Sequence, residues 1–454
     1  MDKQKEYNQC SKEEYCKECT ANKSCKAWAD FVLLHNDKKF YSHFDKRVSL
    51  AMPSIRGYVM DSQRIARHSF YPFIHFTKTI SRYGKKDPKK RELYYCSHLD
   101  RCVYQRYAFL INQKYNERIK DTLINDVAIA YRNNLGKNNI DFAKKAFDAI
   151  KQKKRCLVIV GDFTEFFDRL DHQYLKKMIC RVLEVERLPE DYFAVFKNIT
   201  RFASWDWGDL VEHSGHKIAE RGIRTILNKQ DTILTKAQFQ QHKKSIVRNN
   251  SSRGIPQGSP ISAVLSNVYM LQFDQEIGNY VSDCNGMYMR YSDDFLIILP
   301  YESKRKIKEH ENAIFSQVKK FVGLDLQKEK TAVYIYDKGS IITFPSNQSA
   351  TIDYLGFVFD GVNVRLRPKA ISKYYYRMRR KARNIGRCNW QSPTGRHISA
   401  KNLYSIYSSG EQQTFIDYAK RAKYTLHLND KEAEALIKYH KRKIAHAIKS
   451  GQKK

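Results

Sequence analysis

Three aspartates stand beside apolar runs that predict buried strands. Asp162 follows the run CLVIVG, and the adjacent Asp293 and Asp294 precede the run FLIIL. A carboxylate that is buried without a partner is costly, and the neighbouring Arg290 can serve at most one of them. Clustered carboxylates also bind divalent cations, and two such ions can stabilise both the attacking and the leaving oxygen of a displacement at phosphorus. Asp162, Asp293 and Asp294 are therefore candidates to hold two divalent cations such as Mg²⁺ for phosphoryl transfer; buried carboxylates paired with Arg or Lys are the structural alternative.

The surrounding elements must bring these separate carboxylates together. Consecutive side chains of a strand point to opposite faces, so Asp293 and Asp294 can serve one cation site only near a tight turn between two strands. The patterns predict a strand pair around the basic loop SRYGKKDPKK (73–95), helices (99–130 and 139–150), a polar helical segment (180–250), a second strand pair (341–359) and basic helices from 369 onward. This order of elements predicts an α+β fold.

The composition indicates a partner that carries negative charge. The chain has 454 residues, too many for one core, and its 82 Lys and Arg exceed its 48 Asp and Glu to give a net charge of +34. The cations recur from end to end, as expected for a surface that binds a polyanion; solvated Lys faces on a soluble protein are the alternative. The 30 Tyr and 24 Phe suit stacking on bases and sugars, although many must be core residues.

The sequence also indicates a cytoplasmic protein without a membrane segment. Its apolar runs are too short to span a bilayer, and the charged start MDKQKEYNQC lacks the apolar block of a secretory signal. Cysteines in that compartment are normally reduced. Four of them, Cys10, Cys16, Cys19 and Cys25, could surround a Zn²⁺ ion, but their outer spacings are not those of a common zinc finger. Reduced thiols on a short helical hairpin are the alternative.

A series of motifs occurs in a fixed order along the chain. They are YR at 131–132, GDFTEFFDRLDH at 161–172, RGIPQGSPIS at 253–262, YSDD at 291–294, GLDLQKEKT at 323–331 and DYLGF at 353–357. In content and order they resemble the reverse transcriptase family, and the later segment FIDYAKRA resembles the thumb of that family. The resemblance runs from about Lys89 to the end of the chain and leaves the first 70 residues outside.

This resemblance implies a right-hand polymerase fold of the α+β class. Residues 1–70 would form a helical N-terminal extension, residues 71–365 the fingers and palm, and residues 366–454 a basic helical thumb. The implied activity is RNA-directed DNA synthesis with deoxynucleoside triphosphates as substrates. The implied partners are an RNA template and the RNA-DNA hybrid, which the protein would recognise through backbone and shape; a homo-oligomer is left open.

Within the resemblance, Asp162, Asp293 and Asp294 are the metal ligands, and the backbone carbonyl of Phe163 faces the metal. Phe167 occupies the position of an aromatic ring that lies under the sugar of the incoming nucleotide and excludes a 2′-hydroxyl. Phe166 and Phe167 are also candidates for the core, and at least one of them is expected there.

Two more motifs are implied to contact the nucleotide. Gln257 lies in RGIPQGSP, whose two Gly and two Pro predict a rigid turn that a ligand can approach closely. By resemblance, Gln257 contacts the sugar and base. Lys330 matches a lysine that offsets charge on the leaving pyrophosphate or donates a proton to it, although Lys328 is close enough to be the matching residue instead.

Other residues are implied to contact phosphates or the strands. Those implied for the triphosphate are Arg132, Lys89 and Arg91, Arg being suited to bidentate contact with phosphate. Those implied for the primer end are Tyr354, Leu355 and Gly356. The run YYYRMRRKAR (374–383) places cations on most faces of a helix and predicts contact with a duplex backbone through Arg377, Arg379 and Arg380. A solvated helix is the alternative.

Departures from well-known branches favour one part of the family. The acidic turn reads YSDD where intron and retron enzymes usually have Ala in the second place, and no endonuclease or RNase H motif follows the thumb. The long polar insertion, DYLGF and FIDYAKRA resemble bacterial defence-associated reverse transcriptases of the DRT, "unknown group" and abortive-infection kind. These enzymes often use a dedicated structured noncoding RNA and act against phage. The alternatives are a retron reverse transcriptase, an untemplated or protein-primed DNA nucleotidyltransferase, and a non-catalytic RNA-binding scaffold, which would predict loss of the aspartates.

Overall fold

The computed structural model describes residues 23–35, 37, 39–80, 88–391, 397–409 and 414–452, without the side chains of residues 23–25, 89 and 133. The chain divides into two compact units that alternate along the sequence. The first unit contains Met1–Tyr131, Phe163–Glu276 and Ser316–Asp325, and the second contains Arg132–Asp162, Ile277–Phe315 and Leu326–Lys454. The motifs at 131–132, 161–172 and 323–331 are therefore each divided between the two units.

The first unit is built around a four-stranded sheet with the order β2-β1-β4-β5. Its strands are β1 (Phe73–Ile80), β2 (Lys89–Tyr95), β4 (Ala203–Asp206) and β5 (Val247–Arg248). β1 pairs with β2 as an antiparallel hairpin and with β4 in parallel. Trp205 of β4 is fully buried beside Ile74, Leu210 and Phe44, so a cluster of large apolar side chains fixes the insertion against the hairpin.

Helices form the rest of the first unit. They are α3 (Lys23–Leu34), α4 (Pro53–Met60), α5 (Ser62–Ala66), α6 (His98–Ile119), α7 (Ile124–Val127), α9 (Phe166–Arg169), α10 (His172–Leu183), α11 (Glu190–Thr200), α12 (Trp207–His213), α13 (Ile223–Leu227), α14 (Lys236–His242), the 3₁₀ turn η2 (Lys243–Ser245) and most of α15 (Ser262–Asp283). α6 is buried along most of its length and is the central helix of this unit.

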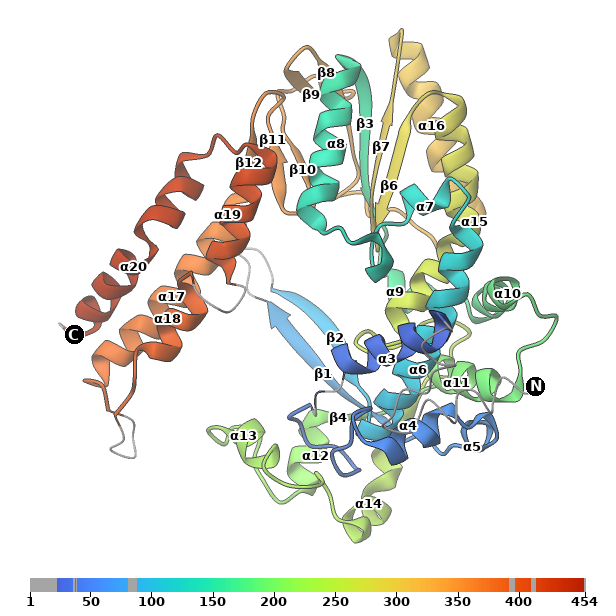
Figure 1. The fold of residues 1–454 in the computed structure, drawn as a ribbon, viewed down its shortest axis with the longest axis vertical. Helices are drawn as coiled ribbons and strands as arrows, with labels where there is room; N and C mark the ends of the chain where they lie inside the picture. The colour runs from blue at the N-terminus through green and yellow to red at the C-terminus, as the bar shows by residue number, and fades with distance from the viewer. Residues whose placement is uncertain are drawn as a thin grey trace. The chain divides into compact units, whose positions relative to one another are not determined.

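The second unit contains a five-stranded sheet with the order β6-β7-β3-β8-β9. Its strands are β3 (Arg155–Asp162), β6 (Met287–Tyr291), β7 (Asp294–Leu299), β8 (Ala332–Asp337) and β9 (Ser340–Thr343). β3 is the central strand, and its residues Cys156–Ile159 are fully buried. Helix α8 (Asn139–Lys153), which follows the 3₁₀ turn η1 (Asn133–Leu135), lies against β3 and β7 (Figure 1).

A small sheet and a group of helices complete the second unit. The sheet has the order β10-β11-β12, formed by Ile352–Tyr354, Phe357–Phe359 and Val364–Leu366. The helices that follow are α17 (Pro368–Arg387), α18 (Lys401–Tyr407), α19 (Phe415–Leu426) and α20 (Lys431–Gln452), and α17 and α20 lie side by side (Figure 1). α16 (Lys304–Lys320) begins in this unit and ends in the first.

The predicted α+β class is confirmed, with two local differences. The segment 180–250, predicted to be helical, also contains β4 and β5. These strands are too short to leave a clear alternation in the sequence; β4 pairs with the distant β1, and β5 pairs with β4. The strand pair predicted over 341–359 is divided, because β9 pairs with β8 while β10 and β11 begin a separate sheet.

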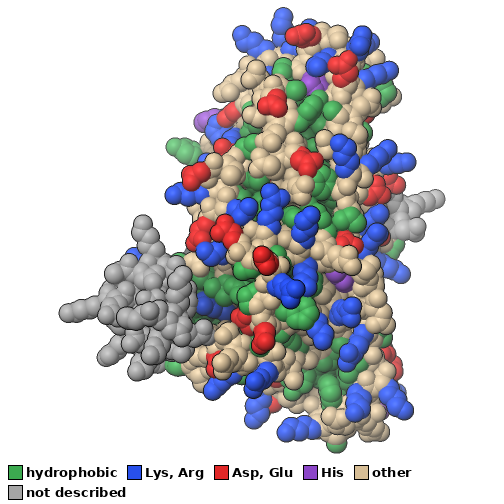
Figure 2. Space-filling model, turned by 90° about the vertical axis from the view of Figure 1, so that its right-hand side faces the viewer, with side chains coloured by type: hydrophobic (Ala, Val, Ile, Leu, Met, Phe, Trp, Pro, Cys, Tyr) green, Lys and Arg blue, Asp and Glu red, His purple; other side chains and the backbone are tan. Residues whose placement is uncertain are grey.

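The surface is rich in cations. Lys and Arg side chains are scattered across the whole face shown in Figure 2 and outnumber the acidic ones there. Within the part of the chain that the structure describes, no helix combines the length and apolar character needed to cross a membrane.

Candidate active site

The pairing of β3 with β7 brings the predicted carboxylates together. The two strands are antiparallel, and their register places Asp162 opposite Asp294. Asp293 lies in the two-residue turn between β6 and β7, just before Asp294. All three aspartates belong to the second unit. The apolar residues of both strands are buried in the core. Their burial holds the acidic ends of the two strands at one edge of the sheet.

The turn that carries Asp293 is strained and braced. Ser292 has a φ of 63°, a left-handed conformation that a residue with a side chain rarely adopts. Arg290 is fully buried, and its Nη1 donates a hydrogen bond of 2.9 Å to the Ser292 carbonyl oxygen. The sequence suggested Arg290 as a partner for a carboxylate; the structure shows that it supports the backbone of the acidic turn. Strain of this kind persists where the surroundings hold it in place, often at functional sites.

Electrostatic repulsion is concentrated at the three aspartates. Burial and the neighbouring Asp162 raise the pKa of Asp293. Burial, followed by Asp293 and Asp162, raises the pKa of Asp294 to about 7, while Lys330 acts in the opposite direction. Asp293 and Asp294 therefore resist ionisation, which is the behaviour expected of carboxylates that lie beside other carboxylates.

The two carboxylate oxygens of Asp162 have different environments. The Lys330 ammonium donates to its Oδ2. Its Oδ1 is buried and accepts no hydrogen bond from the described residues. A buried carboxylate oxygen without a donor, adjoining two acidic groups with raised pKa values, is chemistry that Mg²⁺ fits. Among the described side chains, no group of three or more His, Cys, Asp or Glu is arranged to hold a metal ion.

The segment around Lys330 is attached directly to the end of β3. The amide of Gln327 donates to the Asp162 carbonyl oxygen at 2.8 Å, and the amide of Lys330 donates to the Gln327 carbonyl oxygen at 2.9 Å. Both lysines that could match the motif are exposed, and Lys330 has its ammonium on Asp162. This contact favours Lys330 over Lys328; its role at the pyrophosphate stays a prediction.

In the first unit, the loop at 253–260 is held by backbone contacts on two sides. The amide of Ile255 donates to the Phe167 carbonyl oxygen at 3.0 Å, and the amide of Tyr94 in β2 donates to the Gln257 carbonyl oxygen at 2.9 Å. Gly258 has a φ of 121°, and a Cβ placed there would come within 2.4 Å of the Tyr94 carbonyl oxygen. The loop therefore joins the residue predicted as the sugar gate to the basic hairpin, with Gln257 half-buried between them.

The two neighbouring phenylalanines have different environments. Phe166 is 3% exposed, and its ring stacks with that of Phe163 at a centroid distance of 5.8 Å. Phe167 is only half-buried. Phe166 is therefore the core residue of the pair, and Phe167 is the one available to a ligand. The predicted contact of the Phe163 carbonyl oxygen with a metal stays a prediction.

The residues predicted for the triphosphate fall in both units. Arg91 is exposed on β2, opposite Lys78 of β1, and Lys89 begins the same strand. Arg132 belongs to the second unit and is 5% exposed. It follows Tyr131, which has a φ of 60°. The described residues predicted for the triphosphate are thus an exposed Arg91 in the first unit and a buried Arg132 in the second.

The turn between β10 and β11 contains the residues predicted for the primer end. Tyr354 is 2% exposed, so its ring lies in the core. Leu355 and Gly356 are half-buried, and their φ values are 48° and 95°. Asn139, at the start of α8, donates from Nδ2 to the Leu355 carbonyl oxygen at 3.0 Å and to the Tyr418 hydroxyl of α19 at 2.9 Å. Sequence reasoning missed Asn139, which ties this turn to α8 and α19.

Sequence reasoning also missed a charged cluster on the first unit. His75 of β1 contacts Glu92 of β2 through Nε2 at 2.5 Å and Asp206 of β4 through Nδ1 at 3.3 Å. Nearby, burial raises the pKa of Asp168, followed by the effects of Glu165 and Glu92. Nothing in the sequence indicated this cluster, because its members come from three strands that meet only in the folded sheet.

Two other predicted groups have different outcomes. Arg377, Arg379 and Arg380 are all exposed on α17, as contact with a backbone requires, and their role stays a prediction. The zinc prediction at Cys10, Cys16, Cys19 and Cys25 lies outside the described side chains.

Comparison with known proteins gives the family. Residues 85–359 match the family model described as reverse transcriptase (RNA-dependent DNA polymerase). No curated protein matches the chain. Among solved structures, apo telomerase from Candida tropicalis, truncated from the C-terminal domain, is 14% identical with a TM-score of 0.41, and the match covers 71% of this chain and 61% of that one.

A second solved structure is telomerase from Candida albicans in complex with the TWJ fragment of telomeric RNA. It is 12% identical with a TM-score of 0.38, and the match covers 94% of this chain and 70% of that one. The family match includes both the strands that carry the aspartates and the loop at 253–260. The chain is a member of the reverse transcriptase family of RNA-dependent DNA polymerases.

Proposed function

We propose that this polymerase extends a DNA strand along a dedicated noncoding RNA by two-metal phosphoryl transfer, in bacterial defence against phage. The observation that carries the catalytic part is the pairing of Asp162 with Asp294 beside Asp293, in a site where burial and mutual repulsion raise the pKa of both Asp293 and Asp294. Such a site is stabilised by cations, and phosphoryl transfer requires them.

In the proposed reaction, the primer 3′-oxygen forms a bond to the α-phosphorus of a deoxynucleoside triphosphate, and the bond from that phosphorus to the β-phosphate oxygen breaks to release pyrophosphate. Asp162, Asp293 and Asp294 would hold two Mg²⁺ ions. When bound, these ions supply charge stabilisation at the attacking and leaving oxygens. Lys330 carries the proton or positive charge that the pyrophosphate needs, and Phe167 excludes a ribonucleotide sugar.

Asp293→Asn tests the catalytic part, because it removes a ligand charge with little change in volume. DNA synthesis is expected to fall by at least about a thousandfold, in keeping with loss of metal-based charge stabilisation, while RNA affinity stays within about twofold. Primer extension with labelled deoxynucleotides measures DNA synthesis, and equilibrium binding measures RNA affinity. An Asp293→Asn protein that no longer folds would instead assign the aspartates a structural role.

The template is tested by sequencing what the enzyme holds and makes. We expect a defined RNA to copurify with the protein and, after addition of Mg²⁺ and deoxynucleotides, a DNA complementary to it. A homopolymeric product would instead support the untemplated transferase, DNA linked to the polypeptide would support protein priming, and a branched RNA-DNA hybrid would support a retron enzyme.

The biological role rests on the resemblance of the long polar insertion, DYLGF and FIDYAKRA to defence-associated enzymes, and on YSDD as a departure from intron and retron enzymes. We expect cells that express the wild-type protein with its native flanking DNA to reduce phage plaque formation, and cells that express Asp293→Asn not to do so. Fractionation of the same cells tests the proposed cytoplasmic location. Equal plaque counts across a broad phage panel would remove the defence proposal without affecting the polymerase assignment.

A further inference from the structure

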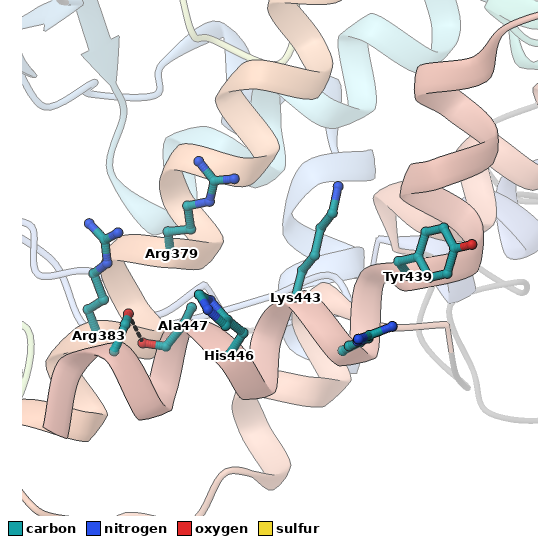
Figure 3. A pocket seen from close by; sticks show the side chains of 8 residues that line it. Arg379, Arg383, Tyr439, Lys443, His446 and Ala447 are labelled. Carbon is teal, nitrogen blue, oxygen red and sulfur yellow. Dashed lines mark hydrogen bonds between the residues drawn. The ribbon is translucent and has the colours of Figure 1, made fainter. Parts of the chain in front are cut away.

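A cleft between α17 and α20 gathers cations away from the aspartates. It has a volume of about 490 Å³, and its lining residues come from α17 and α20 alone: Arg379, Arg383, Tyr439, Arg442, Lys443, His446, Ala447 and Ser450. In Figure 3, Arg379 and Arg383 project from one helix, while Lys443, His446 and Tyr439 line the other. None of the lining residues is acidic, and none belongs to the carboxylate site.

Of the arginines that the sequence predicted to bind the strands (Arg377, Arg379 and Arg380), the cleft includes only Arg379. Arg379 and Arg383 are four residues apart, so they lie on one face of α17, and both line the cleft. Arg377 and Arg380 of the same helix are absent from the lining. The cleft therefore uses only some of the arginines of α17.

Close packing fixes the two walls. A Cβ on Gly386 of α17 would come within 2.2 Å of the Ile448 carbonyl oxygen, and one on Gly451 of α20 would come within 2.4 Å of the Arg383 carbonyl oxygen. Met378 and Ala382 of α17 also pack with Ile444 of α20 in a buried cluster. The backbones approach this closely only because glycine has no side chain, so the width of the cleft is set by the fold.

Tyr375 positions two of the cations. Lys443 donates a hydrogen bond of 2.8 Å to the Tyr375 hydroxyl, and its ammonium lies 4.3 Å from the ring centroid. The guanidinium of Arg379 lies 5.4 Å from the centroid of the same ring. Among the described residues, no carboxylate forms an ion pair with the four Lys and Arg side chains of the cleft. Like charges held this close repel one another and favour a bound anion.

We propose that the α17/α20 cleft binds the phosphodiester backbone of an RNA segment, as a docking site separate from the polymerising centre. Arg offers a fork that matches phosphate oxygens, and three arginines from two helices suit successive phosphates of one strand. Tyr439 is 40% exposed at the rim and offers a ring on which a base stacks. The volume suits one or two nucleotides, within the range of roughly 300–1,000 Å³ typical of ligand sites.

The inference rests on the proposed function only in naming RNA as the ligand. It assigns the cleft a part in retaining the RNA, not in the polymerisation reaction.

The test compares two double variants. Arg383→Ala with Arg442→Ala removes two exposed arginines from the cleft. Arg181→Ala with Arg187→Ala removes two exposed arginines from and beside α10, with the same change of charge.

The copurified RNA, or a long transcript of it, is titrated against each protein at several salt concentrations. We expect the cleft variant to lose roughly tenfold or more in RNA affinity, with a salt dependence shallower by roughly one to two units on a log–log plot, while the α10 control stays within about twofold of wild type. Thermal unfolding of both variants establishes that they are folded. Equal affinity of the cleft variant and the control would overturn the proposal.

Two further measurements separate this proposal from the polymerase assignment and from a change in folding. Extension of a short preformed primer–template at saturating concentration should stay within about twofold of wild type in the cleft variant, because the cleft acts outside the reaction. Photocrosslinking of thiouridine-labelled RNA to wild-type protein should label the peptide that contains Tyr439. Loss of affinity for a DNA duplex with RNA binding unchanged, or crosslinks confined to other helices, would contradict the RNA assignment.

Discussion

At the scale of single residues, the aspartates that make the site also destabilise it. Asp294 is the clearest case, because burial, Asp293 and Asp162 together raise its pKa from an ordinary value of 3.8 to about 7. A raised carboxyl pKa means that the folded protein disfavours the ionised form. The cost is absent below the unfolded pKa, grows as the pH rises from about 4 to about 7, and is complete above that.

Asp294→Asn should therefore stabilise the fold at alkaline pH. We expect a gain of about 1 kcal/mol at pH 8 without metal, a shift of roughly 2–4 °C in the unfolding midpoint, because the amide cannot ionise. The gain should disappear near pH 4, where the wild-type carboxyl is protonated in both states. Calorimetry of both proteins at the two pH values with a chelator present measures this, and a gain independent of pH would show that repulsion is not the cause.

Phe167→Ala should change sugar selectivity without unfolding the protein. The half-buried ring is expected to exclude a 2′-hydroxyl, so its removal should raise the use of ribonucleotides relative to deoxynucleotides by at least about tenfold. The matched variant Phe166→Ala empties a core position and should instead cost roughly 3–5 kcal/mol of stability. Competition assays with paired nucleotides measure selectivity, and an unchanged ratio in Phe167→Ala would remove this residue from the gate.

At the scale of elements, the loop at 253–260 depends on a glycine that packs against β2. Gly258→Ala would place a Cβ within 2.4 Å of the Tyr94 carbonyl oxygen at a φ of 121°. We expect nucleotide incorporation to fall by more than about tenfold and stability to fall by roughly 2 kcal/mol or more, since backbone cannot move aside cheaply.

Gly215→Ala is the control for strain alone, because Gly215 has a φ of 84° but nothing within 4 Å of the added Cβ. It should cost roughly 1 kcal/mol and leave incorporation unchanged. Chemical denaturation measures the stability of the two variants, and steady-state kinetics measures their nucleotide incorporation. Similar losses in both variants would attribute the effect to the positive φ instead of to the contact with β2.

Asn139 offers a second test at this scale, because it joins α8 to both the β10–β11 turn and α19. Asn139→Ala should raise the dissociation constant of primer–template by roughly threefold to tenfold, since the turn loses its support from both sides. The neighbouring Asn138→Ala removes only the helix cap, whose side chain accepts from Ile140, and should cost about 1 kcal/mol of stability. Equal effects on primer–template binding would show that Asn139 acts only through the helix.

At the scale of the whole molecule, the net charge of +34 should make RNA binding strongly dependent on salt. Each phosphate neutralised contributes roughly 0.7–0.9 to the log–log slope, so a protein with six to ten such contacts loses about 10³–10⁵ in affinity between 50 and 200 mM salt. We expect at least a hundredfold loss, measured by equilibrium binding. A shallow slope would mean that most of the cations face solvent without contacting the RNA.

Several parts of the molecule could be predicted from the sequence because the signal was local. The apolar runs beside Asp162 and Asp294 identify β3 and β7, since a short continuous apolar run bounded by a charged residue is typical of a buried strand. The basic hairpin of β1 and β2, α8 and the basic α17 were predicted from similarly local patterns. The loop containing Gln257 was marked by its own Gly and Pro residues.

Tertiary structure alone decided how those local pieces combine. It set the register that pairs Asp162 with Asp294, the contact of Lys330 instead of Lys328 with Asp162, and the burial of Phe166 instead of Phe167. The strands β4 and β5, the bridge made by Asn139 and the α17/α20 cleft also depend on it. Each joins segments distant in the chain, and a pairing between distant segments leaves no periodicity or motif in either of them. The sequence by itself determined the chemistry and the family, because these reside in residue types and short spacings; the folded chain determined which side chains meet.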